Sequence, residues 1–117
     1  MEAGDVVLAA LVQADGERKI RPALLLCQLP PFGDWLACGI SLQTRHQVDG
    51  FDEMIAEDHP DFSQSGLRSG SLIRLGFLGT LAESDIGGTL GRIAPTRLQR
   101  LRRNLAQHLL AEPGLRR

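Results

Sequence analysis

The sequence has little net charge, a single lysine and no long hydrophobic run. Its 117 residues include 13 Lys and Arg against 14 Asp and Glu, which gives a formal net charge of −1. A protein that holds duplex DNA by bulk positive charge needs an excess of bases, so this class of partner is excluded. The longest apolar run, Val6–Val12, is too short to cross a bilayer and has acidic neighbours, unlike a signal peptide. We therefore expect a cytoplasmic protein without membrane association.

The sequence also lacks the patterns that are typical of metal and cofactor sites. Its two cysteines do not have metal-ligand spacing, and its three histidines are scattered along the chain. It contains no Gly-x-Gly-x-x-Gly motif, no Walker-type loop and no Gly-x-Ser-x-Gly nucleophile motif. We expect neither a metal nor a cofactor.

The two cysteines flank a predicted turn at residues 30–34. If this hairpin has a symmetric register, Cys27 and Cys38 face each other across two antiparallel strands, and a disulfide is geometrically feasible. A reducing cytoplasm favours two buried thiols instead.

The composition is that of one folded domain, which we expect to span residues 1–117. With 43% hydrophobic and 23% charged residues, the chain does not belong to the disordered or low-complexity classes. A chain of this size buries roughly two-thirds of its unfolded surface, which is enough for one core.

Short apolar runs separated by Gly-rich corners predict a mainly β fold. Pro22 suits the first position of a strand, and Gly76 and Gly79 indicate bends or bulges in another. Between the strands, the acid-rich segment 49–61 is interpreted as a solvated loop, within which Phe51–Ile55 is a candidate edge strand. The main predicted strands are Val6–Val12, Ala23–Cys27, Trp35–Leu42, Ser71–Leu81 and Gly91–Ile93.

A C-terminal helix is predicted over residues 95–111. Pro95 suits its first turn, and Pro113-Gly114 is a stop signal, whereas Ala94 is a weak N-cap that leaves the first turn prone to fraying. A helix with one apolar face must lie on a sheet, so the expected architecture is a small half-open β-barrel with a C-terminal α-helix. The apolar stripe consists of Leu98, Leu101, Leu105 and Leu109, with Arg100, Arg103 and Gln107 on the opposite face.

Three stretches carry candidate functional residues. Lys19 and Arg21 lie at the start of a buried strand, where an arginine held by the following proline can bind a phosphate. Ser41 and Gln43 share one face at the end of the third strand, and Arg74 interrupts an apolar strand. The alternative interpretation of the first two stretches is that they carry ordinary exposed strand-end side chains. The alternative for Arg74 is a structural ion pair with one of the acids.

Taken in order, these stretches resemble the PemK/MazF family of toxins from type II toxin–antitoxin modules. The resemblance covers about 105 residues of the chain, and each piece is weak by itself, whereas the ordered set is specific. It is carried by Gly4–Val7, Arg21–Leu26, Cys38–Gln43, Asp61–Leu67, Ser71–Leu75 and Leu90–Pro95.

The resemblance implies a homodimer of SH3-like barrels of the CcdB/Kid/MazF type. Such a protein cleaves single-stranded RNA without a metal, because the 2′-hydroxyl of the substrate attacks the adjacent phosphorus and leaves a 2′,3′-cyclic phosphate. A cognate antitoxin neutralises such a protein by covering its active-site groove. The family arginine before the strand-initial proline matches Arg21, and the family hydroxyl residue, usually Thr, matches Ser41, so these two are the expected catalytic residues. We expect Lys19, Gln43 and Arg74 to bind RNA.

The sequence departs from the family pattern at two positions. Gly76 stands where the PemK/Kid branch has an aspartate that shares acid–base work with the arginine matched by Arg74. Ser41 keeps the hydroxyl but lacks the methyl group that restricts a threonine rotamer. An alternative hypothesis is therefore a catalytically inactive module of the same fold that binds protein or RNA. A gyrase poison on the related CcdB-like fold is disfavoured. That activity resembles one carried by an aromatic C-terminal tail, whereas this sequence has Gly114–Arg117 there.

Overall fold

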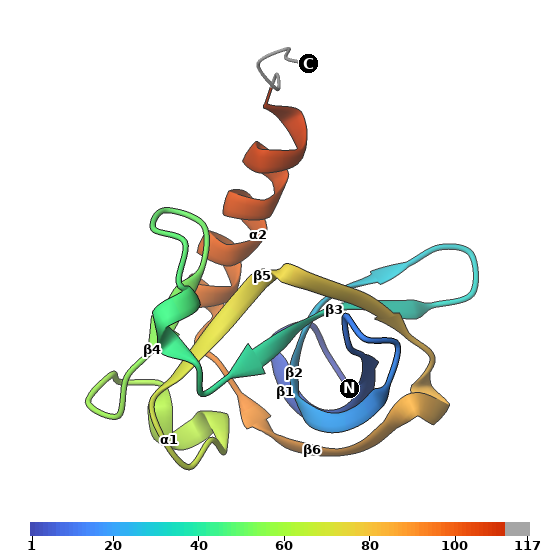
Figure 1. Cartoon of the computed structure of the whole chain (residues 1–117), viewed down its shortest axis with the longest axis horizontal. Helices are drawn as coiled ribbons and strands as arrows, with labels where there is room; N and C mark the ends of the chain where they lie inside the picture. The colour runs from blue at the N-terminus through green and yellow to red at the C-terminus, as the bar shows by residue number, and fades with distance from the viewer. Residues whose placement is uncertain (112–117) are drawn as a thin grey trace.

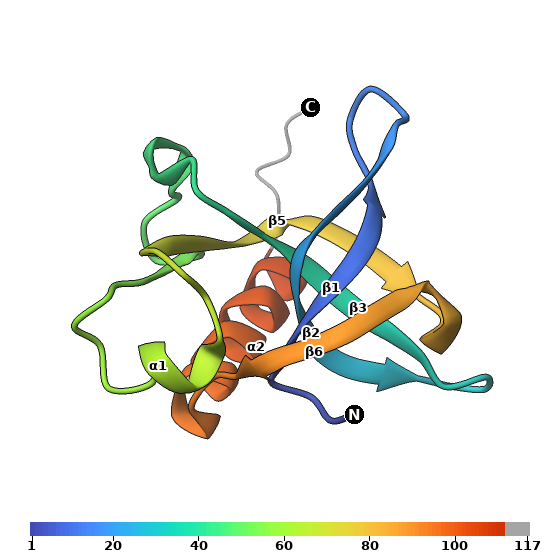
Figure 2. The same cartoon turned by 90° about the horizontal axis from the view of Figure 1, so that it is seen from below.

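Six antiparallel strands form one sheet that curls into a half-open barrel, with a C-terminal helix packed against it (Figures 1 and 2). The computed structural model describes residues 1–111. The strand order in the sheet is β4-β5-β3-β2-β1-β6. The expected mainly β architecture with a C-terminal helix is confirmed. The elements are β1 (Asp5–Val12), β2 (Arg18–Leu29), β3 (Asp34–Ser41), η1 (Thr44–His46), β4 (Glu53–Ile55), α1 (Phe62–Ser65), β5 (Ser71–Leu81), η2 (Glu83–Asp85), β6 (Ile86–Arg92) and α2 (Pro95–Leu110).

The middle of the sheet is buried on both faces, which explains its continuous apolar runs. In β2, Leu24 and Leu26 join a core cluster that includes Leu101 of α2. The alternate residues, Ala23 and Leu25, belong to a second cluster in the barrel interior. A strand in this position has no solvated face, so the alternation of apolar and polar residues that marks a half-buried strand is missing.

Two strands extend further than the sequence predicts. Pro22 lies inside β2, where it pairs with Leu8 of β1, rather than at the first position of the strand. Pairing of β2 with β3 begins only at Ala23, so Pro22 lies where β2 has a single neighbouring strand and proline is tolerated. The last strand begins earlier than the predicted Gly91–Ile93, because β6 already starts at Ile86.

The register of the β2–β3 hairpin rules out the symmetric arrangement of the two cysteines. Cys38 pairs with Leu24, and Cys27 pairs with Leu36 beyond a register shift. Both thiols are free. The turn already pairs Leu29 with Asp34, which leaves Cys38 two positions past the partner of Cys27, and the bulge in β2 adds one more position, so the cysteines lack the cross-strand placement that a disulfide needs.

A large bulge interrupts the pairing of β5 with β3, as the two glycines in that strand predict. Cys38 pairs with Leu78, whereas the next residue, Gly39, pairs with Arg74. Leu75, Gly76 and Phe77 therefore lie between two consecutive pairs, and the phase of the side chains changes across them.

The first turn of α2 is capped by an aspartate from another part of the chain. The Ala94 backbone N–H donates to Asp61 Oδ2 over 3.0 Å. Arg97 donates to the same carboxylate twice, from Nε to Oδ2 over 2.8 Å and from Nη2 to Oδ1 over 3.0 Å. The expected fraying is thus prevented by a long-range cap. The hydrogen bonds from Arg97 lower the pKa of Asp61 to about 2.

Three of the six acids in the acid-rich segment are structural, so its interpretation as a solvated loop holds only for the exposed Asp49, Glu57 and Asp58. Asp61 and Asp52 are buried. Asp52 accepts backbone N–H groups of Val48 and Leu75, each over 2.9 Å. Glu53 in the edge strand β4 binds both Arg97 and Arg100 of α2.

The predicted apolar stripe of α2 is correct in its middle and wrong at its end. Leu101 and Leu105 are buried, and Leu98 packs against the same cluster. Leu109 is 72% exposed because the helix continues past the sheet, as Figure 1 shows. The predicted stop signal at Pro113-Gly114 lies outside the described residues. Within residues 1–111, no helix is both long enough and apolar enough to cross a membrane.

We expect Leu101→Ala to lower the free energy of unfolding by about 2–5 kcal/mol, because it leaves a cavity between the helix and the sheet. Leu109→Ala is the matched control on the same helix, and its effect should stay within about 0.5 kcal/mol. Urea unfolding of both variants measures the difference. Equal effects of the two substitutions would contradict the docking of α2 described above.

The Asp61–Arg97 pair predicts a specific loss of stability in acid. The pKa of folded Asp61 is about 2, below its ordinary value of 3.8, so its ionised form stabilises the fold above pH 4 and this contribution disappears as the pH falls toward 2. Asp61→Asn should cost about 3 kcal/mol at pH 7, since it leaves Arg97 short of a buried counter-charge.

The difference between wild type and Asp61→Asn should shrink between pH 4 and pH 2, as measured by urea unfolding at each pH. The exposed Asp58 provides the control, and Asp58→Asn should show no such pH-dependent difference. A constant Asp61→Asn penalty down to pH 2 would contradict the assignment.

Candidate functional site

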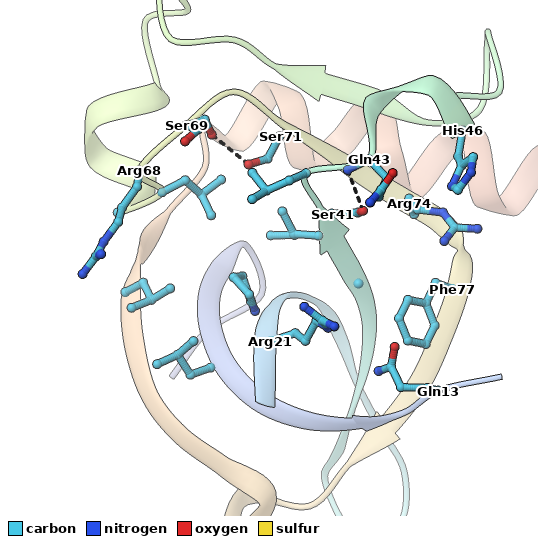
Figure 3. Close-up of a pocket in the computed structure, with 18 residues that line it drawn as sticks. Gln13, Arg21, Ser41, Gln43, His46, Arg68, Ser69, Ser71, Arg74 and Phe77 are labelled. Carbon is cyan, nitrogen blue, oxygen red and sulfur yellow. Dashed lines mark hydrogen bonds between the residues drawn. The ribbon is translucent and has the colours of Figure 1, made fainter. Parts of the chain in front are cut away.

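A pocket of about 750 Å³ opens at one end of the barrel (Figure 3). Its lining comes from β1, β2, β3, β5 and β6, from the segments that follow β1 and β3, and from the segment between α1 and β5. Its lining residues are Leu8, Gln13, Arg21, Pro22, Gly39, Ile40, Ser41, Leu42, Gln43, His46, Gly66, Leu67, Arg68, Ser69, Ser71, Arg74, Phe77 and Leu90.

The structure brings four of the five predicted site residues into this pocket. Arg21, Ser41, Gln43 and Arg74 all line it. Lys19 does not, and its Nζ lies 3.9 Å from Glu17 Oε1 on the exposed part of the β1–β2 hairpin. Figure 2 shows this hairpin projecting from the barrel.

Strand pairing explains why Arg21 and Ser41 converge. Ala23 of β2 pairs with Gly39 of β3, and Arg21 and Ser41 each lie two residues beyond that pair, in the same direction. Alternation along a strand therefore places both side chains on the face that Ala23 presents to the barrel interior. At the end of the barrel, the side chains of β2 and β3 that face the interior change from apolar to polar. These polar side chains line the pocket.

The Ser41 hydroxyl is held by a local hydrogen bond. Its Oγ accepts the backbone N–H of Gln43 over 2.9 Å, as the dashed line in Figure 3 shows. This contact restrains the serine rotamer, which a threonine restrains by its methyl group. Because the oxygen is the acceptor in this contact, its own O–H remains free to donate into the pocket.

The pocket is lined by three arginines and by no carboxylate, although the whole chain has more acids than bases. Within residues 1–111, none of Arg21, Arg68 and Arg74 takes part in an ion pair. The structural ion pair considered for Arg74 is therefore not formed there. Figure 3 shows Arg21 in the middle of the pocket and Arg68 at its outer edge. Unpaired guanidinium groups around a hollow favour an anionic ligand, above all a phosphate.

Thiol chemistry has no place in this site. Burial is the main cause that raises the pKa of the Cys38 thiol to about 12, so no thiolate nucleophile forms there. Within residues 1–111, no group of three or more His, Cys, Asp or Glu side chains could hold a metal ion.

Sequence reasoning missed Gln13, His46 and Phe77. Gln13 and His46 lie in polar loop segments, where nothing in the sequence separates a pocket residue from a solvated one. Phe77 enters the pocket through the β5 bulge, and the signal that could have found it is Gly39. A glycine inside a buried strand often marks the close approach of another group.

Comparisons with known proteins identify the fold. No protein-family model matches the sequence. No curated protein is similar to it in sequence. Among solved structures, an endoribonuclease in complex with its cognate antitoxin, from mycobacterial species, matches with a TM-score of 0.65 and 20% identity over 97% of this chain and 99% of that chain.

The chain has the fold of this endoribonuclease. The match spans almost the full length of both proteins, so the fold expected from the PemK/MazF resemblance is confirmed. Because folds host many activities, the function has to be argued from the pocket itself.

Proposed function

We propose that this protein is an endoribonuclease that cleaves single-stranded RNA without a metal ion. The observation that carries the proposal is the pocket in which Arg21 and Arg74 lie without counter-ions, together with the Ser41 hydroxyl. The fold of a solved endoribonuclease supports the same activity.

In the proposed reaction, the 2′-oxygen of a nucleotide attacks the adjacent phosphorus and the bond from phosphorus to the 5′-oxygen breaks. The 2′-hydroxyl loses a proton and the leaving 5′-oxygen gains one, so the products are a 2′,3′-cyclic phosphate and a 5′-hydroxyl. Arg21 stabilises the charge that develops on the phosphate and takes part in proton transfer, and the Ser41 hydroxyl donates to a phosphate oxygen. His46 adds an imidazole to the same pocket, a side chain of the kind that serves as general acid or base.

Gln43 and Arg74 position the RNA in the pocket, which contributes to catalysis by holding the reacting groups in line. Lys19 contacts RNA only where the strand leaves the pocket, along the β1–β2 hairpin. This arrangement uses a few local cations, so a net charge of −1 is compatible with a single-stranded substrate.

We further propose that the protein is a homodimer and that a cognate antitoxin inhibits it. An acidic, extended segment of such an antitoxin would compete with RNA for Arg21 and Arg74. The endoribonuclease with the same fold was solved in complex with its cognate antitoxin.

The second candidate function is an inactive module that binds RNA or protein through the same pocket. Gly76 motivates it, because a glycine cannot transfer a proton at the position where the PemK/Kid branch has an aspartate. Cleavage of RNA separates the two hypotheses.

Purified protein in EDTA should cleave a long single-stranded RNA and leave 2′,3′-cyclic phosphate ends. Arg21→Ala should reduce the rate roughly 100- to 1,000-fold, the usual loss when one group that stabilises the transition-state charge is removed. Arg18→Ala is the matched control, since Arg18 lies in the same strand but does not line the pocket. RNA that stays intact at a large excess of protein would favour the binding module.

Ser41→Ala should lower the cleavage rate by about 100-fold, because the phosphate loses a hydroxyl donor. Ser41→Thr should retain at least the wild-type rate, because the methyl group adds a second restraint on the same hydroxyl. Single-turnover kinetics with the mapped RNA substrate measures both variants. Equal losses in the alanine and threonine variants would show that the site needs the space of serine and not its hydroxyl.

A further inference from the structure

The position of Phe77 depends on the glycine that faces it across the β5 bulge. A Cβ on Gly39 would lie 2.9 Å from Phe77 Cε2, closer than real Cβ contacts allow. The ring therefore lies against the backbone of β3 at a place where only glycine leaves room. Gly39 and Phe77 both line the pocket.

The Phe77 ring is fixed on one side and accessible on the other. It is half-buried and packs against the core cluster of the barrel interior. Figure 3 shows it between Arg74 and Gln13, at the wall of the pocket. A ring held in this way is already ordered, so a ligand that stacks on it does not have to immobilise it.

None of the other large aromatic side chains of the chain can play this role. Trp35 is buried in the barrel interior, and Phe51 and Phe62 pack against the core under α2. Phe32 is 88% exposed in the segment between β2 and β3 and does not line the pocket.

We propose that Phe77 is the platform on which a base of single-stranded RNA stacks while the adjacent phosphate lies among Arg21 and Arg74. This inference rests on the proposed function and names a positioning residue for it. Aromatic faces beside arginines are the usual surface for single strands, since their unstacked bases are free to leave the neighbouring base. Duplex bases are already stacked and cannot reach such a ring. Stacking accepts every base, so Phe77 contributes affinity rather than sequence choice.

The test measures binding of a fluorescent single-stranded 10-mer of DNA in EDTA, a probe that lacks the 2′-hydroxyl and cannot be cleaved. Phe77→Leu should weaken binding by about tenfold, and Phe77→Tyr, which keeps the ring, should stay within about twofold of wild type. Phe32→Leu makes the same chemical change outside the pocket and should leave the affinity unchanged. Thermal melting of each variant identifies any loss of folded protein.

Abasic nucleotides introduced one position at a time separate stacking from general packing. At one position, the missing base should weaken binding to wild type by about tenfold and to Phe77→Leu by less than twofold. Gly39→Ala, which displaces the ring, should weaken binding of the intact 10-mer in wild type but not in Phe77→Leu.

Equal abasic penalties in wild type and Phe77→Leu would overturn the inference, as would unchanged affinity of Phe77→Leu or no binding of the 10-mer. Unchanged affinity is also the result expected if the ring instead receives an apolar side chain of a protein partner.

The endoribonuclease proposal and the stacking proposal for Phe77 fail separately. Cleavage of long RNA at an unchanged rate by Phe77→Leu overturns the role of Phe77 alone. Binding of the 10-mer that depends on Phe77, with long RNA left intact, overturns only the endoribonuclease.

Discussion

The burial of the central strands on both faces is the constraint that decides where a functional site can form. Leu24 and Leu26 of β2 face the core under α2, while Ala23 and Leu25 face the barrel interior. An unpaired charge in such a sheet would lose its hydration without compensation. Polar side chains can therefore enter only where this double burial ends. Arg21 precedes the first β2–β3 pair, and the other groups of the pocket lie at a strand end or beside a break in register.

The second determinant is the partition of charges between the two ends of the chain. Arg97 and Arg100 of α2 bind Asp61 and Glu53, which are two of the six carboxylates in the acid-rich segment. The pairs with Glu53 tie the helix to the edge strand β4. A total charge of −1 therefore conceals a local cationic hollow, because Arg21, Arg68 and Arg74 line the pocket and no carboxylate of residues 1–111 does.

The sequence alone predicted those parts of the structure that depend on neighbours along the chain or across one hairpin. Arg21 and Ser41 converge because adjacent antiparallel strands place the start of β2 beside the end of β3, an arrangement that follows from two short apolar runs and one turn. Long-range partners leave no local pattern. Asp61 and Arg97 are 36 residues apart, and nothing near either residue indicates that an aspartate caps a helix that begins with a poor N-cap. Lys19 lies two residues before Arg21 but does not line the pocket, and the local sequence does not indicate this difference.

The β5 bulge decides which residues of this strand line the pocket. In an unbroken strand, residues 74 and 76 would share a face and residues 75 and 77 would share the other. Here Arg74 and Phe77 line the pocket, Leu75 is buried in the core under α2, and Gly76 does not line the pocket. The change in phase thus places Phe77, and not Gly76, beside Arg74 in the lining of the pocket. Position 76 does not line the pocket, so the reaction proposed above relies for proton transfer on groups that do, among which are Arg21 and His46.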